Sequence, residues 1–328
     1  MTSSTPRFAP HGPLGMGGAP LGNLFTRIPD AVAAGAIAAA WEAGIRHFDT
    51  APHYGAGLSE HRLGAVLRHH PRDAYTLSTK VGRLLEPAAA VPDPDENFAG
   101  GLSFRRRLDY GYDGTLRSID DSLQRLGLSR IDIAYIHDCA PDWLGPSWRA
   151  QFDIAMHGAA RALTRLREEG VIGAWGLGVN VVEPCLLALQ QADPDLFLVA
   201  GRYTLLDHTA LAELLPACAP RGVRVVLGGP YNSGLLAGGT TFNYEAAAPD
   251  MLARARAVGA VCARHGVDLK AAALQFCAAH PVVAAVIPGP RTAEEVRQNA
   301  AAMVQPIPAA LWSELKAAAL LPQDAPTP

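Results

Sequence analysis

The strongest constraint on the fold of this chain is a regular alternation of short apolar runs with longer helix-like segments. Runs rich in Val, Ile and aromatic residues are typical of buried strands, and the segments between them have the length of helices. The predicted strands are Gly12–Leu21, Ile45–Asp49, Tyr75–Lys80, Ile131–His137, Gly173–Val179, Leu196–Ala200, Val223–Leu227 and Val282–Ile287. Eight units in 328 residues give 328/8 = 41 residues each, which predicts one (β/α)8 barrel with long loops at its C-terminal face.

The alternative fold for this pattern is a doubly wound parallel sheet with a small second domain. No shift in composition marks a linker, so we expect a single domain over residues 1–328, with flexible ends at 1–11 and 319–328. The segment Gly82–Gly111 follows the third predicted strand and is rich in Pro, Gly and charged residues. A loop of that length in a compact domain is usually either functional or disordered.

The composition excludes several classes of protein. The 28 Lys and Arg nearly balance 31 Asp and Glu, and only 18% of residues are charged, so neither a disordered nor a nucleic-acid-coating protein is indicated. The five cysteines are scattered without a C-x-x-C spacing, which predicts free thiols in a reducing cytoplasm, no disulfide framework and no metal site. No signal-peptide core and no apolar stretch of membrane-spanning length is found. We therefore expect a cytoplasmic protein with a small-molecule partner and leave the oligomeric state open.

Four successive predicted strands end in polar side chains. Asp49 closes IRHFDT, Lys80 closes YTLSTK, His137 lies in IDIAYIHD and Asn180 closes GAWGLGVN. Each alone has an ordinary explanation, such as a helix cap, an extended Lys at a strand end or an Asn in a turn. Equivalent places on four consecutive strands indicate a shared site instead, because the carboxyl ends of barrel strands carry the functional residues.

Tyr54, five residues after Asp49, completes a set of groups suited to acid–base chemistry. A tyrosine has a pKa near 10, but an ammonium close to its oxygen stabilises the phenolate, and Lys80 is placed to do this. A buried Lys needs a counter-ion, for which Asp49 is available. His137 can orient a substrate oxygen and share its proton. Such a set moves a proton on or off a C–OH or C=O oxygen and needs a separate hydride carrier for a redox reaction.

These residues resemble the signatures of the aldo-keto reductases, a family of (β/α)8 oxidoreductases with a nicotinamide cofactor. FDTAPHYGAGLSE carries Asp49 and Tyr54, the strand TLSTK carries Lys80, and YIHD carries His137. The match in order and placement runs from Leu14 to about Asn299. The resemblance implies that these four residues are catalytic. It also implies chemistry at a carbonyl or hydroxyl carbon, since relatives that reduce enone double bonds have Glu in place of this His.

The resemblance also implies a set of cofactor contacts. Asn180 matches the residue that holds the nicotinamide carboxamide, although its usual Ser neighbour is Val179 and the usual Gln of the sixth strand is Ala200. LGGPYNSGLL resembles the loop over the pyrophosphate, for which the alternative is an ordinary Gly-rich strand exit, and IPGPRTAEEVRQN resembles the adenosine end. The implied contacts besides Asn180 are Gly228, Gly229, Pro230, Tyr231, Ser233, Gly234, Leu235, Gly289, Arg291, Glu295, Gln298 and Asn299.

Two departures in the adenosine segment favour NAD over NADP. In NADP-dependent relatives a Lys stands at the position of Gly289 and an Arg at that of Glu295, and both hold the 2′-phosphate. A carboxylate repels a phosphate but accepts a hydrogen bond from a ribose 2′-hydroxyl. We expect NAD to be the cofactor. NADP is the alternative, because Arg291 or Arg297 could reach a phosphate.

Two further segments resemble the aldose dehydrogenase branch of the family, whose members oxidise a cyclic hemiacetal at C1 to a lactone. They are LDYGYDGTLRSIDDSLQRLGLSRIDIAYIHD and AGRYTLLD. The branch implies a sugar substrate such as L-fucose, L-galactose or D-arabinose, with pyridoxal, oxidised to 4-pyridoxolactone, as the alternative. We expect Gly82–Gly111 and the segment with Trp143 and Trp148 to wall the pocket. Other interpretations are an NADPH-dependent aldehyde reductase and a cofactor-sensing regulatory protein similar to potassium-channel β subunits.

Overall fold

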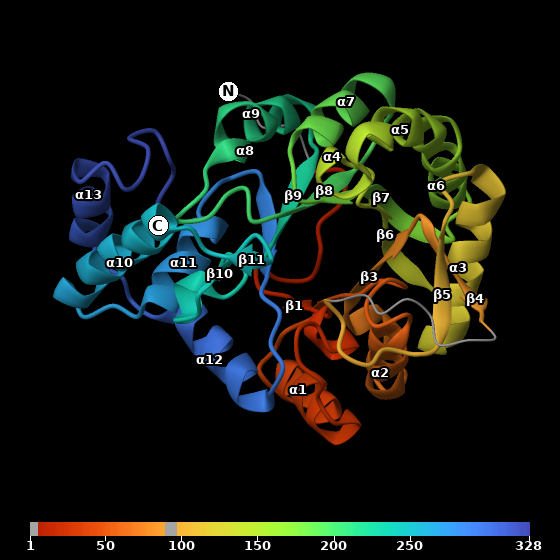
Figure 1. The fold of residues 1–328 in the computed structure, drawn as a ribbon, viewed down its shortest axis with the longest axis horizontal. Coiled ribbons are helices and arrows are strands. Elements are labelled where there is room, and N and C mark those ends of the chain that lie inside the picture. Colours follow the sequence, from red (N-terminus) through yellow and green to blue (C-terminus); the bar gives the residue numbers. More distant parts are fainter. Residues whose placement is uncertain (1–5, 89–96) are drawn as a thin grey trace.

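Eight parallel strands form one barrel in the computed structural model, which describes residues 6–88 and 97–328 (Figure 1). The strands, in order around the barrel, are β1 (Met16–Gly17), β2 (His47–Asp49), β3 (Thr76–Val81), β6 (Ile131–His137), β7 (Ile172–Val179), β8 (Leu196–Ala200), β9 (Arg224–Gly228) and β12 (Val283–Ile287). Leu14 bridges in parallel to Val286 and brings the first and last strands together. The prediction of a (β/α)8 (TIM) barrel is confirmed. The doubly wound alternative is wrong, because such a sheet leaves two edges open.

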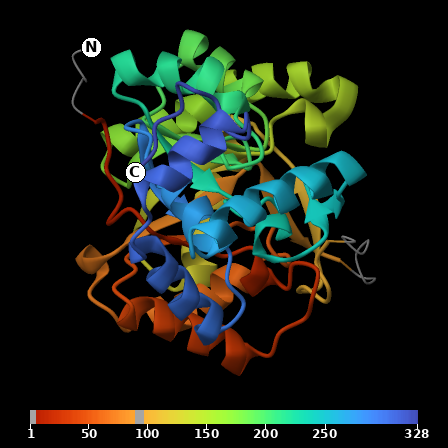
Figure 2. The same ribbon diagram turned by 90° about the vertical axis from the view of Figure 1, so that its left-hand side faces the viewer.

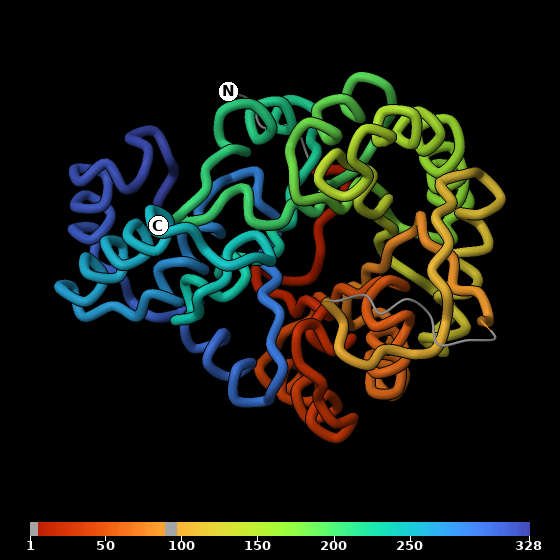
Figure 3. Tube along the Cα trace, in the orientation of Figure 1, coloured from red at the N-terminus to blue at the C-terminus, as the bar shows by residue number. Residues whose placement is uncertain are grey.

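Helices cover the outside of the barrel. The longer ones are α1 (Asp30–Glu42), α2 (Leu58–Leu67), α3 (Tyr112–Leu126), α5 (Trp148–His157), α6 (Ala159–Glu168), α7 (Glu183–Gln191), α10 (Pro249–Arg264), α11 (Leu269–Ala278), α12 (Ala293–Val304) and α13 (Ala309–Ala317). The short ones are α4 (Pro141–Leu144), α8 (Thr209–Ala212) and α9 (Leu214–Cys218). Helices α1 and α12 pack side by side although they lie far apart in the sequence, so the ring of helices closes as the barrel does (Figure 3).

Alternation along the strands decides which side chains face the interior of the barrel. Ile133 and Tyr135 of β6 belong to a buried cluster with Leu196 and Leu198 of β8. Side chains two residues apart on a strand share one face. His137, at the end of β6, therefore lies on the same face as this cluster, at the carboxyl end of the barrel. The apolar interior ends where the polar residues of the strand ends begin.

The first strand is much shorter than the predicted Gly12–Leu21. Only Met16–Gly17 pairs with β2, and Pro20–Gly22 forms a 3-10 turn instead. Pro20 has no N–H to donate to a strand ladder, and proline is favoured in the first turn of a helix. The early turn carries the chain across the end of β2, where Gly18 N donates to Asp49 O at 2.7 Å.

The segment Gly82–Gly111 contains an antiparallel hairpin of β4 (Arg83–Pro87) and β5 (Phe104–Leu108). Arg105 and Arg107 of β5 both donate to the Glu86 carboxylate, at 2.7 and 2.6 Å, which pairs the two strands through their side chains. A second hairpin of β10 (Thr241–Phe242) and β11 (Glu245–Ala246) follows β9, and Figure 2 shows both hairpins on the same side of the molecule. This segment was expected to be a loop because it is rich in Pro, Gly and charged residues. It forms a hairpin instead, whose two strands pair with each other and not with the barrel.

The chain ends are held more firmly than expected where the structure describes them. Leu321 and Ala325 pack into the main core, so the expected flexible end at 319–328 is wrong for these two residues. Near the other end, Arg7 N donates to Gly222 O at 3.2 Å and His11 N donates to the Thr76 hydroxyl at 3.0 Å. Residues 1–5 of the predicted flexible start lie outside the described residues. No helix within 6–88 or 97–328 has the length and apolarity needed to cross a membrane.

Candidate active site

The ends of three strands bring Asp49, Lys80 and His137 to one edge of the barrel. Asp49 is the last residue of β2, Lys80 the fifth of β3 and His137 the last of β6. These strands are parallel neighbours in the order β2, β3, β6, so their carboxyl ends lie together. The strand order thus brings these side chains together, as the sequence predicts. Their catalytic roles stay a prediction.

Tyr54 reaches the same edge from the turn after β2, and two glycines allow it. A Cβ on Gly22 would lie 2.5 Å from the Tyr54 carbonyl carbon, and a Cβ on Gly55 would lie 2.4 Å from Gly22 O. Gly55 also has φ of +63°, a conformation that other residues rarely adopt. The two loops can therefore touch backbone to backbone only because both residues lack a side chain.

Lys80 and Asp49 form a buried ion pair. The Lys80 ammonium lies 2.7 Å from the Asp49 carboxylate and also donates to Thr50 O at 2.8 Å, while the Ser78 hydroxyl donates to Asp49 at 2.7 Å. Burial raises the pKa of Asp49, and the charge of Lys80 opposes this rise. Charges this deeply buried are tolerated only when paired and hydrogen-bonded.

The structure corrects the expected effect of Lys80 on Tyr54. Its ammonium lies over the tyrosine ring, 4.5 Å from the ring centroid. The pKa of Tyr54 is nevertheless well above its ordinary value, because burial and the carboxylates of Asp49 and Asp138 disfavour the phenolate, with Arg83 opposing them. Asp49 compensates the Lys80 charge at 2.7 Å, so this lysine does not by itself make the tyrosine acidic.

His137 lies beside Tyr54 and is uncharged. The two ring centroids are 5.7 Å apart, with the planes at 83°. Burial, followed by the charges of Arg83 and Lys80, holds the pKa of His137 well below its ordinary value. The hydroxyl of Tyr110 donates to His137 O at 2.6 Å and fixes this end of β6. A neutral imidazole can donate or accept a hydrogen bond without carrying charge.

Aromatic rings surround Tyr54 and His137. The His53 ring lies 5.3 Å from both Phe98 and Trp143, and Phe98 also stacks on Tyr54 with centroids 5.9 Å apart. Phe98 comes from Gly82–Gly111, whose residues 89–96 are outside the described part. Trp143 is 45% exposed, whereas Trp148 packs against Phe152 and is buried, so the expectation that this segment walls the pocket stays a prediction. The sequence analysis did not single out His53 or Phe98.

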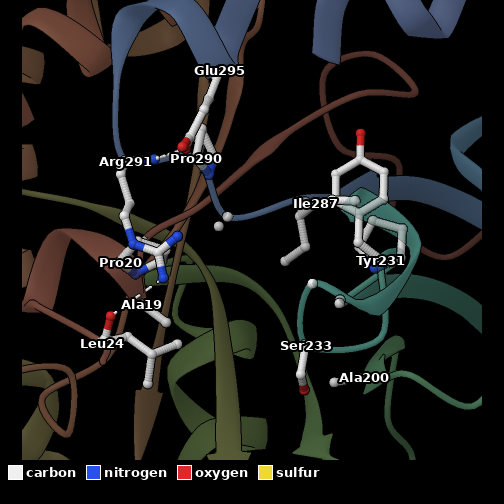
Figure 4. Close-up of a pocket in the computed structure, with 18 of the residues that line it drawn as sticks. Ala19, Pro20, Leu24, Ala200, Tyr231, Ser233, Ile287, Pro290, Arg291 and Glu295 are labelled. Carbon is white, nitrogen blue, oxygen red and sulfur yellow. Dashed lines mark hydrogen bonds between the residues drawn. The ribbon is translucent and has the colours of Figure 1, made fainter. Parts of the chain in front are cut away.

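A cavity of about 360 Å³ extends from Asp49 and Tyr54 to the start of α12 (Figure 4). Ala200 lies on its wall, and so do Leu24, Phe25 and Tyr244. The predicted cofactor residues that line it are Gly228, Gly229, Pro230, Tyr231, Ser233, Gly234, Gly289, Arg291, Glu295, Gln298 and Asn299. The structure thus brings together residues from two segments about sixty positions apart. Asn180 and Leu235 do not line this cavity, and the Asn180 amide donates to Asp142 at 3.2 Å.

The walls of this cavity fit a dinucleotide. After β9 the chain turns tightly through Gly229 and Gly234, with φ of +57° and +98°, and both glycines line the cavity without a side chain that would fill it. Lys270, the second residue of α11, and Arg291 also line it and can meet phosphate oxygens. Lys270 could not be predicted from the sequence, because no motif marks it.

Glu295 and Arg291 are joined at the end of the cavity next to α12. The Glu295 carboxylate accepts a hydrogen bond from Arg291 N at 2.6 Å (Figure 4). The Thr292 hydroxyl accepts one from Glu295 N at 3.2 Å. This is a helix capping arrangement at the start of α12. Gly289 has a packing role as well, because a Cβ there would lie 3.0 Å from the ring of Pro20. Within the described ranges, no group of three His, Cys, Asp or Glu could hold a metal.

This chain is similar to several known proteins over nearly its whole length. Residues 13–319 match the Aldo/keto reductase family. The chain is 42% identical to D-threo-aldose 1-dehydrogenase of a Pseudomonas species, covering 98% of this chain and 99% of that protein. It is 41% identical to pyridoxal 4-dehydrogenase of Microbacterium luteolum, covering 94% of each. Among solved structures, an aldo-keto reductase from Bacillus halodurans is similar in fold, with a TM-score of 0.71 and 24% identity over 97% of this chain and 96% of the other.

Proposed function

The chain belongs to the aldo/keto reductase family, and on that basis we propose that it is an NAD-dependent dehydrogenase that oxidises a cyclic hemiacetal at C1 to a lactone. The observation that carries the proposal is the buried Lys80–Asp49 pair beneath Tyr54, beside an uncharged His137, at one end of a long cavity. The similarity to an aldose dehydrogenase over nearly the whole chain supports a sugar substrate. The same proposal places the enzyme in the cytoplasm, where its five buried, unpaired cysteines stay reduced.

The chain's own groups account for the proton in this reaction. As the C1–H bond breaks and the hydrogen leaves as hydride, the C1–O bond gains double-bond character and the hydroxyl proton passes to Tyr54, which must be in its phenolate form to accept it. His137, neutral and next to Tyr54, holds the substrate oxygen through a hydrogen bond. The bound nicotinamide supplies the hydride acceptor. Since C1 of a hemiacetal already carries the ring oxygen, the product is an ester within the ring, which is a lactone.

Residues at both ends of the cavity would hold the cofactor. Gly228 and Gly229 would leave room for a pyrophosphate near the backbone, and Lys270 with Arg291 would supply positive charge. Glu295 supports NAD over NADP, because its carboxylate lines the cavity where a 2′-phosphate would bring a second negative charge.

Pyridoxal is the second candidate substrate. The rings of His53, Phe98 and Trp143 around Tyr54 suit a flat aromatic ring as well as the apolar face of a sugar. The 41% identity to a pyridoxal 4-dehydrogenase supports it nearly as well as the sugar.

The deciding experiment follows NADH absorbance with purified enzyme, NAD or NADP, and L-fucose, L-galactose, D-arabinose or pyridoxal in separate assays. Trapping the product with hydroxylamine, which gives a hydroxamate from a lactone but not from a free acid, identifies the product class. NADH formed with one of these substrates together with a trapped lactone supports the proposal. Reduction of aldehydes with NADPH and no oxidation of any hemiacetal would overturn it.

A further inference from the structure

Lys270 is a cation on the wall of the cavity that extends from Tyr54 to α12. The chain uses arginine for nearly all of its positive charge, and only three of its 28 Lys and Arg are lysines. All three lie within the described ranges. Lys80 is buried in the pair with Asp49 and Lys316 lies in the last turn of α13, so Lys270 is the one lysine that lines the cavity.

Hydrogen bonds fix both the backbone and the side chain of Lys270. Its N–H donates to the Asp268 side chain, which caps α11, at 2.8 Å. Its Nζ donates to Oε1 of Gln298 at 2.9 Å, and Gln298, on α12, also lines the cavity. The amide nitrogen of Gln298 donates to Glu294 at 3.1 Å. The amide of Gln298 is therefore held with its oxygen toward the lysine.

The charge of Lys270 has no carboxylate partner among the described residues, and its side-chain hydrogen bond there goes to a neutral amide. Glu294, one turn before Gln298 on α12, is paired instead with Arg297 at 3.7 Å. An ammonium carries three hydrogens and an amide oxygen has two lone pairs, and the bond between Lys270 and Gln298 uses one of each. A hydrogen-bond donor and an acceptor therefore lie side by side on the cavity wall, and both can bind a ligand.

The position of this pair along the cavity indicates which part of a dinucleotide it meets. In the proposed reaction the nicotinamide lies at the Tyr54 end, so the adenosine occupies the end next to α12. Glu295 and Gln298 are three residues apart on α12 and share one face of the helix, one turn from each other. Since Glu295 is proposed to face the ribose 2′-position, Gln298 and Lys270 lie one turn further, at the base. Adenine presents an acceptor, its ring nitrogen N1, beside the donor of its amino group.

We propose that Lys270 is a specificity-determining residue for the cofactor: together with Gln298 it recognises the amino edge of adenine, with the ammonium donating to N1 and the Gln298 oxygen accepting from the amino group. The proposal rests on the proposed function, because it needs an adenine dinucleotide as cofactor. Hypoxanthine carries a hydrogen at N1 and an oxygen in place of the amino group, which reverses the pattern. A site built to hydrogen-bond one pattern discriminates against a base that lacks it.

Calorimetric titration with NAD, with its hypoxanthine analogue deamino-NAD and with NADP tests this without substrate. The wild type should bind NAD about tenfold more tightly than deamino-NAD. In Lys270→Met the NAD affinity should fall about tenfold and the deamino-NAD affinity less than about threefold. Gln298→Leu should act in the same way, and the double variant should lose little more than either single variant, because the two residues act as one unit. Lys316→Met is the matched control and should change no affinity.

Three results of this titration would overturn the proposal. An equal loss for NAD and deamino-NAD in Lys270→Met would mean that the lysine meets the pyrophosphate, which both dinucleotides carry. A much larger loss for NADP than for NAD would mean that it meets the 2′-phosphate. A wild type that does not distinguish NAD from deamino-NAD would show that the base edge is not recognised.

Reductive methylation read by mass spectrometry gives the second readout, because the chain has only three lysines. NAD should protect Lys270 from methylation and leave Lys316 unchanged, while Lys80 stays unmodified in its buried pair. Equal methylation of Lys270 with and without saturating NAD would also overturn the proposal. If the wild type binds NAD but oxidises none of the four hemiacetals, the proposed function fails, while both readouts still decide on Lys270. A wild type that binds neither NAD nor NADP would overturn both.

Discussion

The ammonium of Lys80 lies 2.7 Å from the carboxylate of Asp49, with side chains only 1% and 3% exposed. Each charge alone would be very costly at this depth, so each residue is stable there only because of the other. The same ammonium lies over the ring of Tyr54. The pair therefore belongs to the buried core and also contacts Tyr54, the residue proposed to accept the proton.

Breaking this pair should destabilise the protein strongly. Lys80→Met leaves Asp49 buried without its counter-ion and should lower the free energy of unfolding by about 3–5 kcal/mol, measured by urea denaturation. The double variant Asp49→Leu with Lys80→Met should recover part of that loss, because no lone charge remains. Arg117→Met breaks an exposed helical pair with Asp121 and should cost about 0.5 kcal/mol or less. Equal losses in the buried and the exposed pair would contradict this view of the active site.

Removing the Tyr54 hydroxyl should separate catalysis from cofactor binding. Tyr54→Phe keeps the ring contacts with Phe98 and His137 but leaves no group to take the proton, so kcat should fall by at least about a hundredfold. NAD affinity, followed by quenching of tryptophan fluorescence, should change less than about threefold, because the cavity extends from Tyr54 to α12 and most of its wall is untouched. A variant that keeps most of its kcat would assign the proton transfer to another group.

Strand periodicity explains why much of this site could be predicted. Asp49, Lys80 and His137 are polar residues at the ends of apolar runs, and parallel strands must bring such ends together. Arg83, His53 and Lys270 could not be found in that way, because they enter the site from a hairpin, a turn and a helix that only tertiary contacts place there. Lys270 lies in the first turn of α11, where its N–H donates to the Asp268 side chain that caps the helix. The alanine-rich sequence of this helix carries no motif that points to a binding site.

Glu295 should control the choice between NAD and NADP. Replacing it by Arg removes a carboxylate from the cavity wall and adds a cation suited to a phosphate, so the ratio of kcat/KM for NADP to that for NAD should rise by about tenfold or more. Glu295→Gln keeps an acceptor for Arg291 N and should give a smaller rise. Glu294→Gln, on the exposed side of the same helix turn, is the control. A wild type that already prefers NADP would refute the assignment of Glu295.

Stability should fall in mild acid because of His47. This side chain is buried in β2, and neither ring nitrogen has a hydrogen-bond partner within the described residues. Burial, followed by the charges of His11 and Lys80, lowers the pKa of His47 from 6.5 to about 3. The unfolded chain therefore binds a proton that the folded chain does not, so the stabilisation present above pH 6.5 is lost as the pH falls toward 3.

Urea denaturation at successive pH values tests this. His47→Leu should flatten the decline in the free energy of unfolding below pH 6.5 by about 1.4 kcal/mol per pH unit. Part of the slope should remain, since burial also lowers the pKa of His53 from 6.5 to about 2. Parallel curves for the variant and the wild type would show that His47 takes up no proton on unfolding in this range.

The close approach of two loops at Tyr54 should make Gly22 intolerant of a side chain. A Cβ on Gly22 would lie 2.5 Å from the backbone of Tyr54, and neither backbone can move aside without displacing the tyrosine. Gly22→Ala should therefore lower kcat and destabilise the protein by about 1–3 kcal/mol. Gly35→Ala is the matched control, because Gly35 lies within helix α1 with no atom within 4 Å of its added Cβ. That variant should be stabilised by up to about 1 kcal/mol through its helix propensity, with kcat unchanged. If Gly22→Ala behaves like Gly35→Ala, the contact of the two loops does not position Tyr54.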